Sequence, residues 1–349
     1  MYVVTESLAT TASLRLTQSY RCFLLILALG SCSNFELFRY THHFHIAMVL
    51  AVLWHAPSAG YFLAGGMVMY GMQRIMQFRR VGIVQARLHI VRRHGSIGAT
   101  ELNFRTLNGG AIQHLPGQFV YLQIPCLSPL EWHPFSLCST PSDSASTLLI
   151  ANRGANSFER AGCFTDRLWQ LAELLAASPP KQEHQVAICV DGPYGEGYDA
   201  HFVRTGGYNA VVLVAGGFGI TPIISVFSAL LEASEAGQLR GVDVDLIWCN
   251  PRPAFFAHTS FARIFALARN NERFSVSLFA TQERLPAQGK LQYWNCHRPD
   301  WPTQLDSARR QAQAGSVLCL VSGPHEMADE LSVVSLEAGF DFRAISFDI

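Results

Sequence analysis

The sequence predicts a partial α-helical membrane hairpin followed by two folded parts, an antiparallel β-barrel and an α/β domain built on a parallel sheet. Three observations predict this order. Apolar residues are concentrated before residue 80, short alternating stretches separated by turns come next, and the second half alternates β-branched runs with helical ones. The expected boundaries are residues 1–80 for the membrane region, 81–205 for the barrel and 206–349 for the α/β domain.

The composition excludes several classes of protein. The 349 residues contain 26 Lys and Arg against 26 Asp and Glu, so the net charge is +0, which excludes a broad nucleic-acid-binding face. Charged residues make up 15% and the mean hydropathy is +0.17, too apolar for a disordered chain. The nine cysteines are scattered with no C-x-x-C, which indicates neither a disulfide framework nor a zinc site.

The hairpin is expected over two apolar runs, residues 35–56 and 60–73, which a turn at residues 57–60 separates. Arg74, Arg79 and Arg80 follow the second run, and clustered positive charge marks the cytoplasmic end of a membrane segment. We therefore expect a multi-pass membrane protein with a lipid bilayer as partner. Everything after residue 80 is then expected in the cytosol.

An earlier apolar run, residues 22–29, is too short to cross a hydrocarbon layer of ~30 Å. Arg15 and Arg21 precede it, an arrangement that also suits a signal peptide. The end of a longer helix suits these residues better, because a second apolar hairpin follows almost at once, and a re-entrant or surface segment is the third alternative. The sequence leaves these alternatives open.

Histidines in the second run raise the question of haem. His42 and His55 are 13 positions apart in an apolar segment, and a histidine inside a membrane is functional by default. The rise between them is about 19.5 Å, the separation that two stacked haems need, but ideal helical geometry places the side chains about 140° apart. Haem ligation and an interfacial position both remain open from spacing alone.

Three alternating stretches, residues 83–93, 99–107 and 118–125, predict the first strands of the barrel. The segment His133-Pro134-Phe135-Ser136 comes soon after them. A hydroxyl between aromatic and proline residues can bind a planar heterocycle, and a purely structural strand end fits as well.

In the second half, a strand at residues 211–215 leads into Gly216-Gly217-Phe218-Gly219, then Thr221 and a helix over 223–233. Thr221 is the expected N-cap and Pro222 the first helical residue. Glycines let a backbone approach a phosphate at a helix start, so the pattern favours nucleotide binding, although it is not the GxGxxG fingerprint. Strands at 242–248, 273–279 and 316–321 follow, the last leading into Gly323, Pro324 and a helix that ends at Gly339.

Together these motifs make the chain, from about residue 22 to residue 349, similar to the ferric reductase/NADPH oxidase family of transmembrane flavocytochromes. The motifs that carry the resemblance are Tyr40-Thr41-His42-His43 with His55, His133-Pro134-Phe135-Ser136, Asp191-Gly192-Pro193-Tyr194-Gly195, Gly216 to Pro222, Arg298-Pro299-Asp300-Trp301 and Gly323-Pro324. The resemblance implies a ferredoxin-reductase-like module, in which the barrel binds FAD and the α/β domain binds NAD(P).

The resemblance also implies roles for individual residues. The residues implied to bind the flavin are His133, Pro134, Phe135 and Ser136. Arg153 and Thr165 are implied to contact its phosphates, and Phe347 is implied to cover its ring. Those implied at NADPH are Gly216, Gly217, Gly219, Thr221, Gly323 and Pro324, with Arg252 and Arg298 at the 2′-phosphate, because an Arg fork suits a phosphate dianion. His42 and His55 are implied as ligands of haem b.

The implied activity is a relay from NADPH through FAD to haem and on to ferric iron chelates. Two alternatives stay open: a superoxide-generating NADPH oxidase with oxygen as acceptor, and a haem-less flavin-binding fragment. The chain departs from the family because it lacks a second apolar histidine pair upstream of residue 42, has Ser322 where cysteine is frequent, and ends on Ile349. We therefore expect the missing helices to come from a longer form or from a partner subunit.

Overall fold

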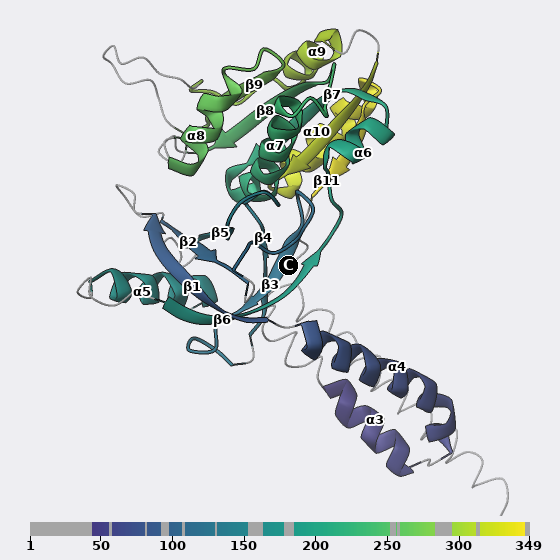
Figure 1. Ribbon diagram of the computed structural model, residues 1–349. Coiled ribbons are helices and arrows are strands. Elements are labelled where there is room, and N and C mark those ends of the chain that lie inside the picture. The colour runs from purple at the N-terminus through teal and green to yellow at the C-terminus, as the bar shows by residue number, and fades with distance from the viewer. Residues whose placement is uncertain are drawn as a thin grey trace, which may run out of the picture. The chain divides into compact units, whose positions relative to one another are not determined.

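The computed structural model describes residues 44–55, 58–80, 82–91, 98–106, 109–129, 131–152, 163–177, 185–251, 256, 259–282, 295–311 and 315–345. The chain divides into two compact units, residues 1–78 with 348–349, and residues 79–347. The larger unit contains two sheets with their helices, and Figure 1 labels the elements.

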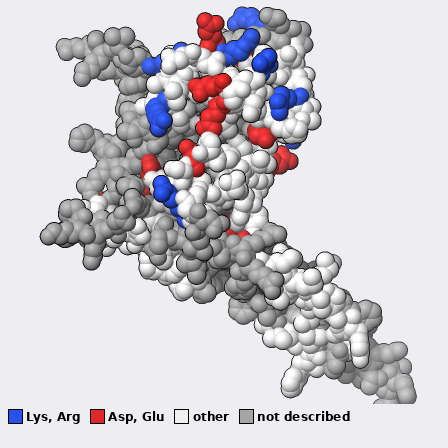
Figure 2. Space-filling model, in the orientation of Figure 1, with Lys and Arg blue, Asp and Glu red and all other residues white. Residues whose placement is uncertain are grey.

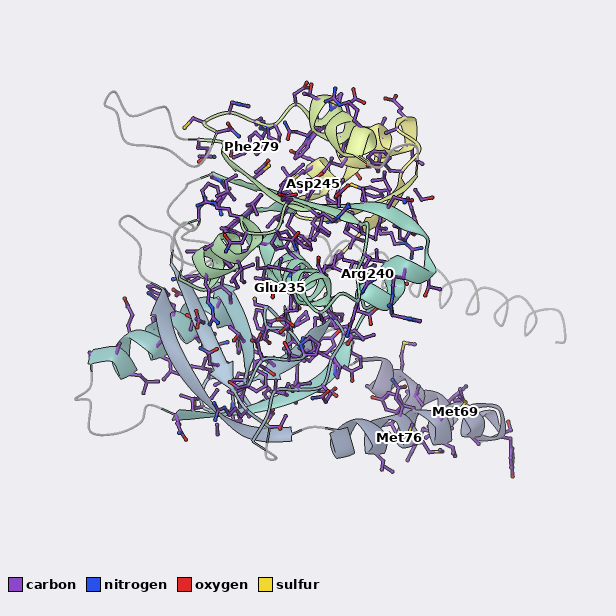
Figure 3. The ribbon with its side chains drawn as sticks, turned by 45° about the horizontal axis from the view of Figure 1, so that its top comes forward. Met69, Met76, Glu235, Arg240, Asp245 and Phe279 are labelled. Carbon is purple, nitrogen blue, oxygen red and sulfur yellow. The ribbon has the colours of Figure 1, made fainter. Side chains whose placement is uncertain are left out.

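The expected hairpin is present as two helices, α3 (Phe44–His55) and α4 (Ala59–Arg80). Their apolar side chains are exposed, including Trp54, Tyr61 and Met69. Residues 64–70 of α4 are exposed without interruption, so the exposed surface runs all the way round that part of the helix. On the face drawn in Figure 2 the described atoms of this hairpin are uncharged, and Figure 3 shows Met69 and Met76 pointing outward.

Length and composition do not by themselves mark this hairpin as membrane-spanning. Within the described ranges, the stretch long and apolar enough to cross a bilayer is Gly217–Glu235, which is mostly buried in the larger unit. Helix α3 has 12 residues, a rise of about 18 Å, whereas α4 has 22 residues but carries glutamines and arginines throughout its last two turns.

The first sheet has six antiparallel strands in the order β4-β3-β6-β1-β2-β5. Their bounds are β1 (Gly82–Val91), β2 (Ala99–Phe104), β3 (Phe119–Gln123), β4 (His133–Ser136), β5 (Ser146–Ala151) and β6 (Gln185–Tyr194). An antiparallel bridge joins Leu137, just after β4, to Leu148 of β5, so the two edges of the sheet meet. The predicted antiparallel barrel is confirmed, and its first three predicted strands lie within a few residues of their expected positions.

The barrel has its own apolar core. Alternate residues point inward, as in β3, where Val120 and Leu122 are buried and Tyr121 is exposed. Helix α5 (Phe164–Ala177) adds one apolar stripe to this core, because Phe164, Leu168 and Ala172 recur every four residues and share a helical face. The N-terminal end of α5 is thereby fixed beside β4.

The second sheet has five strands in the order β11-β10-β7-β8-β9, and every neighbouring pair is parallel. Its strands are β7 (Tyr208–Gly216), β8 (Asp243–Asn250), β9 (Phe274–Ala280), β10 (Ser316–Ser322) and β11 (Asp341–Ala344). Its helices are α6 (Ala200–Thr205), α7 (Ile220–Glu235), α8 (Thr259–Ala268), α9 (Trp301–Gln311) and α10 (His325–Glu337). The predicted α/β domain is confirmed.

Helices cover both faces of this sheet (Figure 1). On β7, Val211 and Leu213 pack in one core with α6, α7 and α8, whereas the alternate residues Val212 and Val214 pack in another with α9 and α10. A strand buried on both faces must be apolar throughout, which explains the β-branched run in the sequence. The carboxyl ends of the strands are left as the edge where ligands bind in such sheets.

One helix start differs from the prediction. Thr221 is not the N-cap of α7: the helix begins at Ile220 and Gly219 occupies the cap position. The cause is a short 3₁₀ turn, η3 (Gly217–Gly219), which leads directly into the helix. The Thr221 hydroxyl donates to the Phe218 carbonyl at 3.0 Å, so it ties the turn to the helix from inside the first turn.

The turn after β7 lies directly against the turn after β10. A Cβ atom on Gly219 would come within 2.0 Å of the Ser322 carbonyl oxygen, and one on Gly323 within 2.9 Å of the Gly216 Cα. Backbone fills the space that side chains would need, so glycine is required at both positions. These two turns therefore form one rigid edge.

We predict that Gly219→Ala lowers the free energy of unfolding by about 1–3 kcal/mol, because the new methyl group overlaps backbone that cannot rotate away. Gly110→Ala is the matched control, since a Cβ there meets no atom within 4 Å. Denaturant unfolding of both variants checks this. Equal midpoints for the two would show that the turns can separate without cost.

Candidate functional site

The His133–Ser136 segment forms β4, and its register on β3 determines which side chains share a face. Leu122 pairs with His133 and Val120 with Phe135. The rings of His133 and Phe135 lie over Phe164 of α5, with centroid distances of 4.3 and 6.2 Å. Ser136 is buried on the other face of the strand. The first turn of α5 and the β4 segment thus lie together, as the flavin assignment requires.

A charged group lies beside this segment. Arg167 of α5 donates to the Glu131 carboxylate through Nη2 and to the Leu127 carbonyl through Nη1. The same carboxylate oxygen is 3.6 Å from His133 Nε2. Thr165, implied at the flavin phosphates, is half-buried in the first turn of α5, and its hydroxyl is 3.3 Å from Cys163 Sγ. Hydroxyl and backbone N–H groups of a helix start are suitable donors for a pyrophosphate.

Three aromatic rings stand on the surface of the same sheet. Phe119 and Tyr121 of β3 and Tyr194 of β6 make mutual edge or tilted contacts, with centroids 5.6 to 6.0 Å apart. The Tyr194 hydroxyl donates to Asp191 at 2.9 Å. Gly192 within β6 and Gly195 directly after it have φ values of +145° and +93°, which only glycine adopts readily. The Asp191-Gly192-Pro193-Tyr194-Gly195 motif therefore forms the irregular end of β6, where its pairing with β3 shifts register.

The glycine turn of the α/β domain is held by a tryptophan. Gly217 has φ +56°, and its carbonyl accepts a hydrogen bond from the Trp248 indole N–H at 2.9 Å. The indole ring of Trp248 is fully buried. Phe256, Phe261 and Phe265 surround it with edge-on contacts. Sequence reasoning missed this bond, although a tryptophan near the carboxyl end of a parallel strand was a signal that could have found it.

A closely packed contact lies at this turn and includes a residue of the barrel. Leu149 of β5 meets there a set of residues from the α/β domain: Gly217, Phe218, Ile220, Trp248, Asn250 and Phe261. Leu149 and Ala99 also pack in the same apolar core as α7. The barrel and the α/β domain therefore meet where both predicted cofactor segments are close by.

The remaining predicted nucleotide residues lie on the same edge. Gly216, Gly219 and Thr221 lie in or next to the turn after β7, and Gly323 and Pro324 face it from the turn after β10. Arg298 is exposed and follows Asn295, which bridges to Phe279 near the carboxyl end of β9. The segment that carries Arg298 therefore lies at the edge where a 2′-phosphate is expected.

Several predicted site residues are not tested. Arg153, Arg252, Phe347 and His42 lie outside the described residues. His55 is described; it is exposed and ends α3 in the smaller unit. The roles of His42 and His55 as one ligand in each of two haem sites therefore stay predictions.

Cysteines near the site are buried and protonated. Burial raises the pKa of the Cys249 thiol to about 12, although Arg298 opposes this shift. Burial also raises the pKa of Cys319 in β10 to about 11. Because the thiolate is the reactive form, these thiols behave as apolar core groups.

Two family models match the chain. Residues 106–197 match an FAD-binding domain, and residues 208–288 match a ferric reductase NAD binding domain. The first range contains β3 to β6 with α5, and the second contains β7, η3, α7, β8, α8 and β9. The predicted FAD and NAD(P) domains are confirmed by these matches.

Two plant oxidoreductases match this chain over part of their length. Ferric reduction oxidase 8, mitochondrial, of Arabidopsis thaliana is 28% identical over 266 residues, which is 73% of this chain and 33% of that protein. Respiratory burst oxidase homolog protein F of the same plant is 29% identical over 216 residues, which is 57% of this chain and 22% of that protein. The chain thus spans a third or less of the length of these relatives.

Solved structures support the fold. A cytochrome P450 reductase of Amycolatopsis has a TM-score of 0.53 at 15% identity, with 76% of this chain and 70% of that chain covered. A ferredoxin NADP⁺ reductase of Neisseria gonorrhoeae with bound FAD and NADP has a TM-score of 0.50 at 16% identity, covering 76% of this chain and 98% of that chain. The predicted ferredoxin-reductase-like arrangement is therefore confirmed.

We predict that Cys126 is alkylated by iodoacetamide at pH 8 in the native protein, whereas Cys249 and Cys319 react only after unfolding. Cys126 is exposed, and the other two are buried with raised pKa values. Peptide mass spectrometry separates the three sites. Labelling of Cys249 at the rate of Cys126 would mean that this edge opens to solvent in the native state.

Proposed function

We propose that this chain, which is related to the ferric reductase/NADPH oxidase family, is a membrane-bound flavin oxidoreductase that carries electrons from NADPH through FAD toward ferric iron chelates. The observation that carries the proposal is the junction at Leu149. There Ala99 and Leu149 of the barrel pack in one apolar core with α7 and the strand that leads into the glycine turn, and Leu149 also lies against Gly217 and Phe218. A flavin and a pyridine nucleotide must meet at such a junction for hydride transfer.

The chain's own residues have distinct tasks in this proposal. Bound FAD supplies the conversion of a two-electron hydride into single-electron steps. The β4 segment with the first turn of α5 binds and orients it, and the α5 start offers donors to its phosphates. The glycine turn receives the dinucleotide at Gly217, where a Cβ atom would meet no protein atom within 4 Å, and Gly216 and Gly219 let the turn pack against the turn after β10. The buried Leu149 and Trp248 keep water from the junction.

The membrane part of the proposal rests on the hairpin and on the resemblance. An apolar helix surface exposed all round is typical of a segment covered by lipid or by further helices. We propose His42 and His55 as haem b ligands and place the larger unit in the cytosol. The helices that complete a haem site would come from a longer form or a partner subunit.

The test uses the full chain purified in detergent from a membrane fraction. We expect FAD to be released on denaturation, and NADPH-dependent reduction of a ferric chelate that superoxide dismutase does not inhibit. Inhibition by superoxide dismutase would assign oxygen as the acceptor and favour the oxidase alternative. Dye reduction without the spectrum of a bis-histidine haem would favour the haem-less fragment, and absence of FAD would refute the proposal.

Arg298→Ala tests the preference for NADPH. We expect KM for NADPH to rise about tenfold with KM for NADH unchanged, because the variant loses a charged partner of the 2′-phosphate. Arg240→Ala is the matched control: this exposed arginine, labelled in Figure 3, precedes the opposite end of β8. Equal effects of Arg298→Ala on both nucleotides would remove the phosphate assignment.

A further inference from the structure

Helix α7 is bonded to the chain segment that follows β4 at two points. The segment is residues 139–142, and its partners on the helix are Ser225 and Glu232. We propose that these contacts form a clasp that fixes the glycine turn relative to the β4 segment. Ser225 and Glu232 are thereby positioning residues for hydride transfer. This inference rests on the proposed function.

The inner half of the clasp is buried. Ser225 Oγ donates to the Ser139 carbonyl at 2.8 Å, and both residues are buried. The same carbonyl oxygen is 3.0 Å from Nε2 of the buried His114, whose Nδ1 is 2.8 Å from the Ile112 carbonyl. The Ser139 hydroxyl in turn accepts from the Thr147 N–H at 3.1 Å. Ser139 is thus fixed to the barrel from two sides and to α7 from a third.

The outer half lies at the surface and uses a carboxylate. Glu232 Oε2 accepts from the Ser142 hydroxyl at 2.6 Å, and Oε1 lies 3.0 Å from the Thr140 hydroxyl, whose single proton it shares with Asp143 Oδ2 at 3.2 Å. Asp143 Oδ2 accepts from the Thr140 backbone N–H at 2.7 Å, which shapes the loop from its own side. Hydrogen bonds to an ionised acceptor are stronger than neutral ones, so the outer contact has a strong electrostatic component.

The spacing on the helix makes the two halves act together. Ser225 and Glu232 are seven residues apart, about two turns of α-helix, so they lie on one face. The loop runs along that face, and it contacts the helix at both ends of the stretch. Two contacts about 10 Å apart resist rotation of the helix as well as translation.

The clasp is close in the chain to both cofactor segments. Ser136 of β4 is three residues before Ser139, and Thr221 of the glycine turn is one helical turn before Ser225. In Figure 1, α7 lies on the side of its sheet that faces the barrel. Hydride transfer requires reacting atoms about 3–3.5 Å apart, and small misplacements cost large factors in rate. A clasp between these segments therefore sets the rate without contacting either ligand.

The experiment is anaerobic stopped-flow reduction of the flavin by NADPH in the full chain. We expect Ser225→Ala and Glu232→Ala to lower the limiting rate of flavin reduction at least about tenfold, while the Kd for NADPH and the FAD content stay unchanged. Glu232→Gln keeps a carbonyl acceptor for Thr140 and should recover most of the rate. Ser142→Asp should be slower than Ser142→Ala, because it places a second carboxylate against Glu232.

Two variants on the same helix serve as controls. Glu235→Ala removes an exposed charge three residues further on, at the helix end labelled in Figure 3. Ser228→Ala removes a buried hydroxyl that has no hydrogen-bond partner among the described residues. Both should reduce flavin at the wild-type rate. A loss of rate in the controls equal to that in Ser225→Ala and Glu232→Ala would overturn the proposal, as would unchanged rates in those two.

Hydrogen–deuterium exchange separates the clasp from the proposed function. In Glu232→Ala we expect faster exchange in residues 139–147 and unchanged exchange in β8, with Glu235→Ala like the wild type. Unchanged exchange in residues 139–147 would refute the clasp, whatever the activity. If the wild type binds FAD but NADPH does not reduce it, the proposed function fails, and the exchange result still decides whether the clasp exists.

Discussion

Contact between two stretches of backbone is the constraint on which the nucleotide edge depends. Gly216 and Gly219 on one turn meet Ser322 and Gly323 on the other at distances that leave no space for a Cβ atom. Because the turns belong to adjacent parallel strands, β7 and β10, the contact also fixes the starts of α7 and α10. The glycines at these positions are therefore required by the close packing of two stretches of backbone, whereas a Cβ atom on Gly217 would meet no atom within 4 Å.

Apolar packing connects the rest of the larger unit to that edge. The start of α7 is fixed by the turn, the body of α7 packs on β7, and residues of β2 and β5 pack in the same core. The barrel is closed by the bridge between Leu137 and Leu148, so its neighbouring residue Leu149 is held in a defined place at the junction. The two cofactor segments are thus connected through apolar packing as well as through hydrogen bonds.

The sequence predicted the elements of this fold well because each has a local cause. The apolar β7 run, the alternating strands and the helix ended by Gly339 all follow from periodicity and turn chemistry. Thr221 was misassigned as a cap because a 3₁₀ turn before a helix leaves no strong local signal. The Trp248 bond and the contacts of Ser139 join residues far apart in the chain, which no local pattern reveals. The domain boundaries and the roles of His42 and His55 as haem ligands stay predictions.

Trp248 has a consequence beyond its bond to the glycine turn. Its indole is fully buried, lies among aromatic rings and donates to the Gly217 carbonyl in the glycine turn. The emission of a tryptophan depends on the polarity and hydrogen bonding around its ring. A change of the glycine turn that breaks this bond would therefore alter the Trp248 fluorescence, so the larger unit contains its own reporter of that turn.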